Sequence, residues 1–75
     1  MSPNHPGPVI RFHRKRAGLS RKDLALLAGV SQTSIYEVEH GKQTARLDTI
    51  FKLLEALNIE LKLDSPLMDE FRAQQ

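Results

Sequence analysis

The side chains best suited to chemistry lie in one short stretch of the chain, residues 29–42 (GVSQTSIYEVEHGK). Gln32, Thr33 and Tyr36 place an amide, a hydroxyl and a phenol close together, with little charge between them. Such groups both donate and accept hydrogen bonds. This spacing predicts a surface that recognises a polar partner through hydrogen bonds.

Catalysis has little support elsewhere in the sequence. The chain has no cysteine, no glycine-rich phosphate loop and no clustered pair of carboxylates. Its three histidines, His5, His13 and His40, follow no common zinc-binding pattern. We therefore expect a protein that is not an enzyme and that binds no metal and no cofactor.

Length and charge narrow the class of protein further. The 75 residues suffice for one small domain with a marginal core, which favours support from an oligomer. Residues 1–22 hold six bases and no acid, whereas residues 23–75 hold five bases and nine acids. This asymmetry indicates one face suited to a polyanion, the alternative being a solvated basic helix. No apolar run reaches the roughly 20 residues of a membrane span, and the lack of cysteine fits a reducing compartment, so we expect a cytoplasmic protein.

Hydrophobic periodicity predicts four helices, and the first three of them end at glycines. They are expected over residues 9–17, 21–28, 32–40 and 47–57. Ser20 and Ser31 are suitable N-cap residues, and Asp23 completes an approximate capping box with Ser20. In the second helix, Leu24 and Leu27 are expected to point inward and Leu26 outward.

One charge is predicted to lie inside the domain. Arg14 shares the inward stripe of the first helix with Ile10, and a buried guanidinium needs a carboxylate partner. Glu39, at the edge of the inward face of the third helix, is the partner that we predict. This pairing argues against the alternative in which the basic residues 9–17 lie on a membrane surface.

The C-terminal part predicts a dimer. Residues 59–64 (IELKLD) alternate between apolar and polar side chains, which is the period of a strand. Because no other strand is predicted, we expect it to pair antiparallel with the same strand of a second copy. The residues predicted for the dimer interface are Phe51, Leu54, Ile59, Leu61 and Leu63. In the alternative, the fourth helix simply continues through Asn58.

The expected organisation has four parts. A flexible N-terminal arm spans residues 1–8, and a folded domain spans residues 9–57. A dimerisation strand follows over residues 58–64. The tail, residues 65–75, is either a short helix or a frayed end that orders on a partner.

The second and third helices, joined by a glycine turn, have the pattern of a helix-turn-helix. A helix in the major groove of DNA must offer hydrogen-bond donors and acceptors to base edges. Glutamine can bond adenine in bidentate fashion, threonine can touch thymine, and glutamate can accept from cytosine. We predict base contacts for Gln32, Thr33, Tyr36 and Glu37, although Tyr36 could equally pack against sugar or phosphate.

The segment LSRKDLALLAGVSQTSIYEVEHGK resembles the helix-turn-helix of the phage repressor and Cro (XRE) family of bacterial regulators. The resemblance implies a compact, all-α, lambda-repressor-like fold of four or five helices, and it too pairs Arg14 with Glu39. It also implies DNA phosphate contacts from Ser20, Arg21 and Lys42. To these we add Ser31, at the start of the third helix, and Lys22.

The segment RLDTIFKLLEALNIELKL is similar to the end of HipB-like antitoxin regulators, in which the fourth helix runs into a dimer strand. This similarity implies a homodimeric repressor of its own operon that binds an inverted repeat of double-stranded DNA and a HipA-like kinase toxin. One alternative is a phage-type or restriction-modification regulator without a toxin. Another is a protein-interaction module that keeps the helix-turn-helix as a scaffold.

Overall fold

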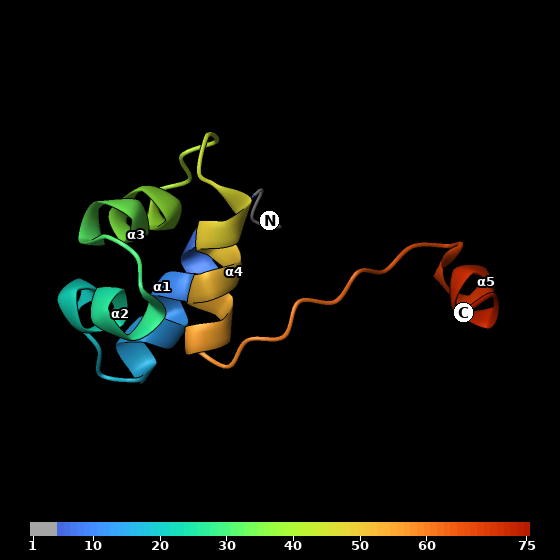
Figure 1. The fold of residues 1–75 in the computed structure, drawn as a ribbon, viewed down its shortest axis with the longest axis horizontal. Helices are drawn as coiled ribbons and strands as arrows, with labels where there is room; N and C mark the ends of the chain where they lie inside the picture. The colour runs from blue at the N-terminus through green and yellow to red at the C-terminus, as the bar shows by residue number, and fades with distance from the viewer. Residues whose placement is uncertain (1–4) are drawn as a thin grey trace.

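The computed structural model describes residues 5–75, and its regular structure over that range is entirely helical. The elements are α1 (Gly7–Arg16), α2 (Arg21–Ala28), α3 (Gln32–Glu39), α4 (Leu47–Ala56) and α5 (Met68–Ala73). The first four pack into one body, and an extended segment carries α5 away from it (Figure 1). The prediction of an all-α fold with a possible fifth helix is thus confirmed. Residues 1–4 of the predicted arm lie outside the described residues.

The start of α1 packs closely against the end of α3. The helix begins at Gly7, two residues before the predicted start, because a proline is tolerated in the first turn of a helix. A Cβ atom on Gly7 would collide with the backbone carbonyls of Val38 and Glu39. A glycine at this position therefore lets the start of α1 pack directly against the end of α3.

Both helices of the motif begin at serine caps. The Ser20 hydroxyl accepts from the backbone N–H of Asp23, and the Asp23 carboxylate accepts from that of Ser20, which completes the predicted capping box. Ser31 accepts from the backbone N–H of Ser34. Between them Gly29 adopts the left-handed conformation, with φ of 74°, and ends α2 sharply.

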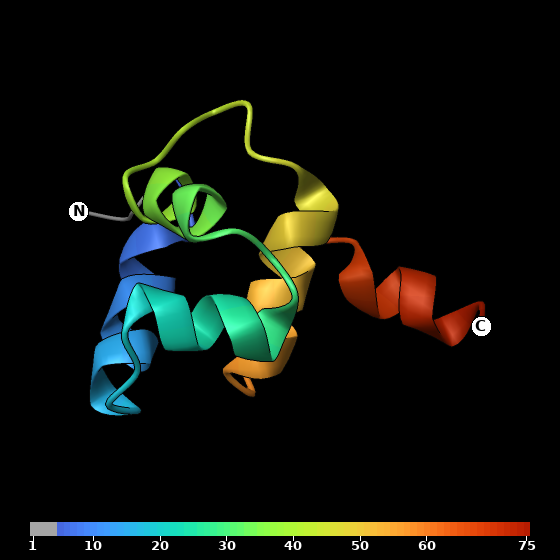
Figure 2. The same ribbon diagram turned by 60° about the vertical axis from the view of Figure 1, so that its left-hand side comes forward.

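The core draws on all four helices of the body. Figure 2 shows α2 crossing the body between α1 and α4, with α3 beside it. Burying each large aliphatic side chain contributes about 1.5–3 kcal/mol of hydrophobic free energy. The buried apolar residues are Ile10, Leu24, Ile35, Val38, Leu53 and Leu54.

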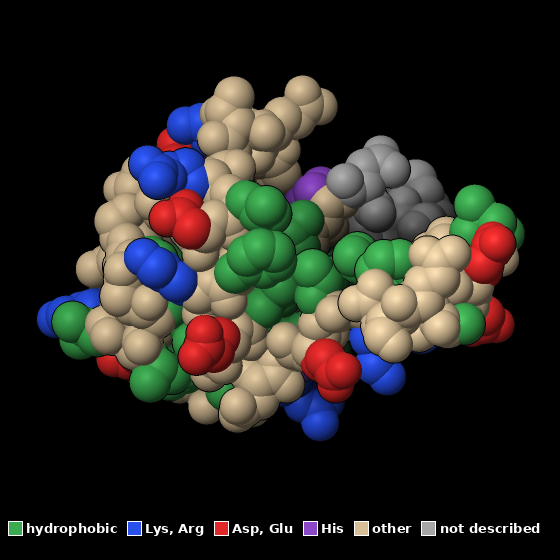
Figure 3. Space-filling view, turned by 45° about the vertical axis from the view of Figure 1, so that its right-hand side comes forward, with side chains coloured by type: hydrophobic (Ala, Val, Ile, Leu, Met, Phe, Trp, Pro, Cys, Tyr) green, Lys and Arg blue, Asp and Glu red, His purple; other side chains and the backbone are tan. Residues whose placement is uncertain are grey.

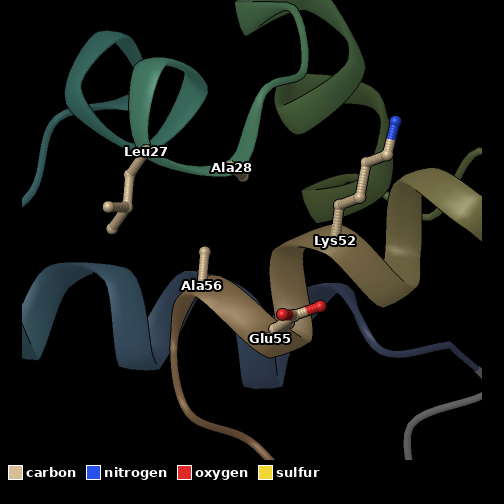
Figure 4. A pocket seen from close by; sticks show the side chains of 5 residues that line it. All are labelled: Leu27, Ala28, Lys52, Glu55 and Ala56. Carbon is tan, nitrogen blue, oxygen red and sulfur yellow. The ribbon is translucent and has the colours of Figure 1, made fainter.

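Leu27 departs from the predicted inward stripe of α2. Its side chain is 61% exposed, because it lies over a hollow between α2 and α4 rather than in the core. Figure 4 shows Leu27 above Ala56, with Lys52 and Glu55 of α4 on the other side of the hollow. Leu26 is exposed as predicted.

The fourth helix ends where the chain turns at Asn58. This residue adopts a left-handed backbone with φ of 57°, a conformation that asparagine tolerates and that a continuing helix cannot contain. The alternative of a helix running through Asn58 is therefore wrong. Residues 59–65 form neither helix nor strand in the single chain, and their pairing with a second copy stays a prediction.

The Glu39 carboxylate is fully buried and lies among three helices. Arg14 of α1 donates to it from Nε over 2.7 Å and from Nη2 over 3.2 Å. Arg21 of α2 donates from Nε over 3.1 Å. The remaining nitrogen of Arg14, Nη1, donates to the Leu19 carbonyl over 2.9 Å. The buried charge is thus paired and hydrogen-bonded, as a charge in a protein interior must be.

These contacts set the protonation state of Glu39. Burial alone would raise the pKa of its carboxyl, but hydrogen bonds from Arg14 and Arg21, together with their positive charges, outweigh burial and hold the pKa below its usual value. A lowered pKa in the folded state stabilises the fold above the pKa of the unfolded chain. That stability is lost as pH falls through the folded-state pKa.

Replacing Glu39 with glutamine is expected to lower the free energy of unfolding by about 3–5 kcal/mol, because it leaves the buried Arg14 guanidinium uncompensated. Urea denaturation at pH 7 measures this loss. The matched control is Glu37→Gln, on the same helix, whose exposed pair with Lys42 is worth about 1 kcal/mol or less. Below a pH of about 4, the two proteins should differ less in free energy of unfolding, because the Glu39 charge then stabilises the wild type less. If this difference in free energy stays constant down to a pH of about 3, the Glu39 charge does not have this role.

Candidate nucleic-acid interface

The turn between α2 and α3 determines which side chains stand at the exposed start of α3. Gly29 ends α2, Val30 packs against the core, and Ser31 caps α3. Gln32 and Thr33 then form the first turn of α3, and both are exposed. Their amide and hydroxyl groups are therefore open to a ligand approaching along this end of the helix.

Tyr36 lies one turn further along the same helix, and its ring is held from both sides. The His40 imidazole stacks on it with a centroid separation of 4.0 Å, and the Arg21 guanidinium carbon lies 5.1 Å from its centroid. Even so, Tyr36 is 51% exposed. A ring fixed in this way presents its phenol in one orientation.

Glu37 differs from the other three predicted base contacts because a cation neutralises it. Lys42, just after α3, places its Nζ atom 2.8 Å from Glu37 Oε2. This ion pair lowers the electrostatic cost of a carboxylate near DNA. It also means that Glu37 and Lys42 must separate if one is to bind a base and the other a phosphate.

The predicted phosphate contacts come from three places along the motif. Ser20, Arg21 and Lys22 lie at the start of α2, whereas Lys42 follows α3. The Ser31 hydroxyl donates to the Ser34 hydroxyl over 2.8 Å and so is already used within α3. Arg21 is divided between Glu39 and Tyr36, and its side chain is 33% exposed. Lys22 is exposed to solvent.

Two contributions were missed from the sequence. One is the stack of His40 on Tyr36, and its signal in the sequence is the four-residue spacing at which helix side chains meet. The other is the bond from Arg21, predicted only as a phosphate contact, to the buried Glu39. No local pattern indicated that second role, because it depends on how α2 packs against α3.

A second basic surface lies on α1. Arg11, Lys15 and Arg16 border a hollow next to His40 at the end of α3. Phe12, also exposed there, has the Arg16 guanidinium carbon 5.6 Å from its ring centroid. The cations of α1 thus extend the positive charge beyond the helix-turn-helix.

The residues predicted for a dimer interface occupy different environments in the single chain. Leu54 lies in the core, and Ile59 packs partly against it. Phe51, Leu61 and Leu63 are exposed. Within residues 5–75 no helix is long and apolar enough to cross a membrane. Over the same range no three side chains of the metal-binding types form a cluster.

Comparison with known proteins agrees with this geometry. The helix-turn-helix family model matches residues 10–63. An HTH-type transcriptional regulatory protein of Methanothermobacter thermautotrophicus is 44% identical over 57 residues, which are 76% of this chain but 18% of that protein. The chain thus spans about a fifth of the length of the first curated relatives that it matches.

Solved structures share the fold. C.AhdI, the restriction-modification controller protein from Aeromonas hydrophila, has a TM-score of 0.65 and 39% identity, covering 72% of this chain and 82% of its own. HipB in its O1-O2 complex has a TM-score of 0.75 and 26% identity, covering 87% of this chain and 94% of its own. The family match covers all four helices of the body except the first turn of α1. The chain therefore belongs to the XRE-type helix-turn-helix family of transcriptional regulators.

Proposed function

We propose that the protein is a sequence-specific DNA-binding repressor that inserts α3 into the major groove. The observation that carries this proposal is the exposure of Gln32 and Thr33 in the first turn of α3, in a motif that also exposes Lys22 at the start of α2 and Lys42 after α3. Helix-turn-helix proteins contact base edges with this part of their second helix. Cations elsewhere in the same motif suit the phosphates of the DNA backbone.

Within this proposal the two kinds of contact have different roles. Lys22 and the helix N-terminus at Ser20 bind the DNA backbone and position the domain, without reading sequence. Gln32 and Thr33 read the bases, and Tyr36 contacts a base or the adjacent sugar from its fixed orientation. When the ion pair between Glu37 and Lys42 opens, Lys42 binds a phosphate and Glu37 accepts a hydrogen bond from cytosine.

The repressor is proposed to act as a homodimer on an inverted repeat with half-sites one DNA turn, about 34 Å, apart. The exposed apolar residues after α4 support this proposal. A small domain of this kind gains stability when such residues are covered. Leu61 and Leu63 lie on the apolar side of the predicted strand. In the dimer this strand pairs with its copy across a two-fold axis.

Its genetic role is proposed to be that of an antitoxin that represses its own operon and binds a HipA-like kinase. Likeness to HipB supports this, since HipB structures cover nearly the whole chain and one of them is a HipA-HipB-O2-O3 complex. The second candidate is a restriction-modification controller without a toxin. It is favoured by the higher identity to C.AhdI, which covers less of the chain.

Gln32→Ala is expected to cost about 1–3 kcal/mol on the preferred operator and to relax preference at one base position, because a bidentate contact is lost. Binding to a randomised operator library measures both effects. Gln75→Ala, at the C-terminal residue, is the control that should bind like wild type. If Gln32→Ala loses the same affinity for the preferred operator and for random DNA, Gln32 does not contact a base.

Lys22→Ala serves as the contrast to Gln32→Ala. It should weaken binding to all sequences alike and reduce the slope of log affinity against log salt by about 1. If wild-type binding shows no salt dependence and no preference for an inverted repeat, the protein-interaction module is the better description.

Leu61→Lys is expected to convert the dimer to monomers in analytical ultracentrifugation, because it places a charge in the apolar seam. Glu60→Lys introduces the same side chain on the other side of the strand and should leave the dimer intact. A dimer that survives Leu61→Lys would show that the seam lies elsewhere.

The antitoxin role predicts a stable complex with a HipA-like kinase encoded beside this gene. Gel filtration of the two co-expressed proteins should give one peak containing both chains. Separate elution of the two proteins would favour the controller without a toxin, whereas DNA binding by this chain would be unaffected by that result.

A further inference from the structure

Helix α5 is too short to be stable by itself. It has six residues, whereas isolated helices shorter than about 12 residues are marginal in water. None of its residues is buried. Its side-chain bonds remain within the tail, where Arg72 contacts Asp69 over 3.5 Å and the Leu63 carbonyl over 3.4 Å. A helix of this kind needs a packing surface that its own body does not provide in this arrangement.

The apolar side chains of α5 and of Leu67, its N-cap residue, share one face. Leu67 and Phe71 are four residues apart, Met68 is adjacent, and Leu67 and Phe71 are both more than half exposed. Arg72 borders this face. The helix therefore offers one aromatic and two aliphatic side chains beside a single cation.

A matching surface exists on α4. Leu47 and Phe51, also four residues apart, are 63% and 46% exposed, whereas Leu53 and Leu54 of the same helix fill the core. Asp48 and Glu55 are exposed as well, and they stand three and four residues from Phe51, the spacing at which helix side chains are neighbours. Figure 3 shows hydrophobic side chains gathered on the face of the body that carries α4. The acidic border of this patch complements Arg72 of α5.

The path of the chain determines which copy can supply α5. From Leu57 to Leu67 the chain runs away from its own body, and Figures 1 and 2 agree that α5 stands clear of α4. Ten residues of extended chain span up to about 33 Å, enough to cross a neighbouring domain of this size. If residues 59–63 pair with their copy, each tail is directed toward the partner and not back to its own α4.

We propose that α5 is exchanged in the dimer, so that Leu67, Met68 and Phe71 of one copy pack on Leu47 and Phe51 of the other. This inference rests on the proposed homodimer and adds a second contact to it, outside the strand. Exchange would cover both of these exposed apolar faces at once. It would also make folding of α5 depend on assembly.

Cross-linking tests the exchange directly, because the natural chain has no cysteine. One full-length variant carries Glu55→Cys, beside Phe51, and a second carries Arg72→Cys, beside Phe71. The two are mixed, allowed to re-equilibrate and treated with a short bismaleimide. We expect a covalent species that contains one chain of each variant. Lys15→Cys, on α1, replaces Glu55→Cys in the control mixture and should give no such species.

Each outcome of this experiment decides the matter. A link between residues 55 and 72 of different chains supports exchange. A further variant carries both Glu55→Cys and Arg72→Cys in one chain. A link within that chain, at the mass of a monomer, would show that α5 folds back on its own α4, and this result overturns the exchange. No link in a sample that sediments as a dimer overturns the exchange and leaves the proposed dimer standing, whereas a monomer in sedimentation overturns both.

A variant of the tail gives an independent measurement. Phe71→Ser should weaken dimerisation at least about tenfold, since buried aromatic side chains dominate small interfaces. Glu70→Ser, at the neighbouring position outside the apolar face, should change the dimer dissociation constant less than about twofold. Equal dissociation constants for Phe71→Ser and wild type would contradict the proposed packing, and circular dichroism of both variants checks that the body remains folded.

Discussion

The buried carboxylate of Glu39 holds the domain together, because three helices meet at this one charge. A carboxylate removed from water is costly unless it is neutralised and hydrogen-bonded, and here Arg14 and Arg21 supply both. The same arginine of α1 also binds the carbonyl of Leu19, in the link to α2. Any orientation of α3 relative to α1 and α2 must therefore keep this one group neutralised and hydrogen-bonded.

The outward face of α3 inherits its rigidity from that arrangement. Arg21 reaches from the buried carboxylate to the ring of Tyr36, and His40 supports the other side of the ring. The residues proposed to bind the DNA backbone and those proposed to read bases thus belong to one packed unit. Gln32 and Thr33, in the first turn of α3, keep side chains that are exposed and outside this network. Adaptable hydrogen-bonding groups on a rigid support suit recognition of base edges.

A small core leaves apolar surface uncovered, and the position of that surface has consequences. Four helices bury six large aliphatic residues, yet the outer edge of α4 and most of the segment after Ile59 remain in solvent. Because the hydrophobic effect scales with the area removed from water, covering this surface is the cheapest further stabilisation open to the chain. The proposed assembly with a second copy would supply the cover that a domain of this size lacks by itself.

The sequence by itself determined the elements and one of their contacts. Periodicity, two serine caps and the glycines marked the helices of the body to within two residues, since these signals act over one or two turns of chain. The pairing of Arg14 with Glu39 followed because both lie on inward faces, where a lone charge is costly. Tertiary structure alone decided that Arg21 shares Glu39 and touches Tyr36, that Leu27 overhangs a hollow, and that Gly7 packs against α3. Each of these depends on the angle and distance between two helices, and those are set by how all the side chains of the core pack at once.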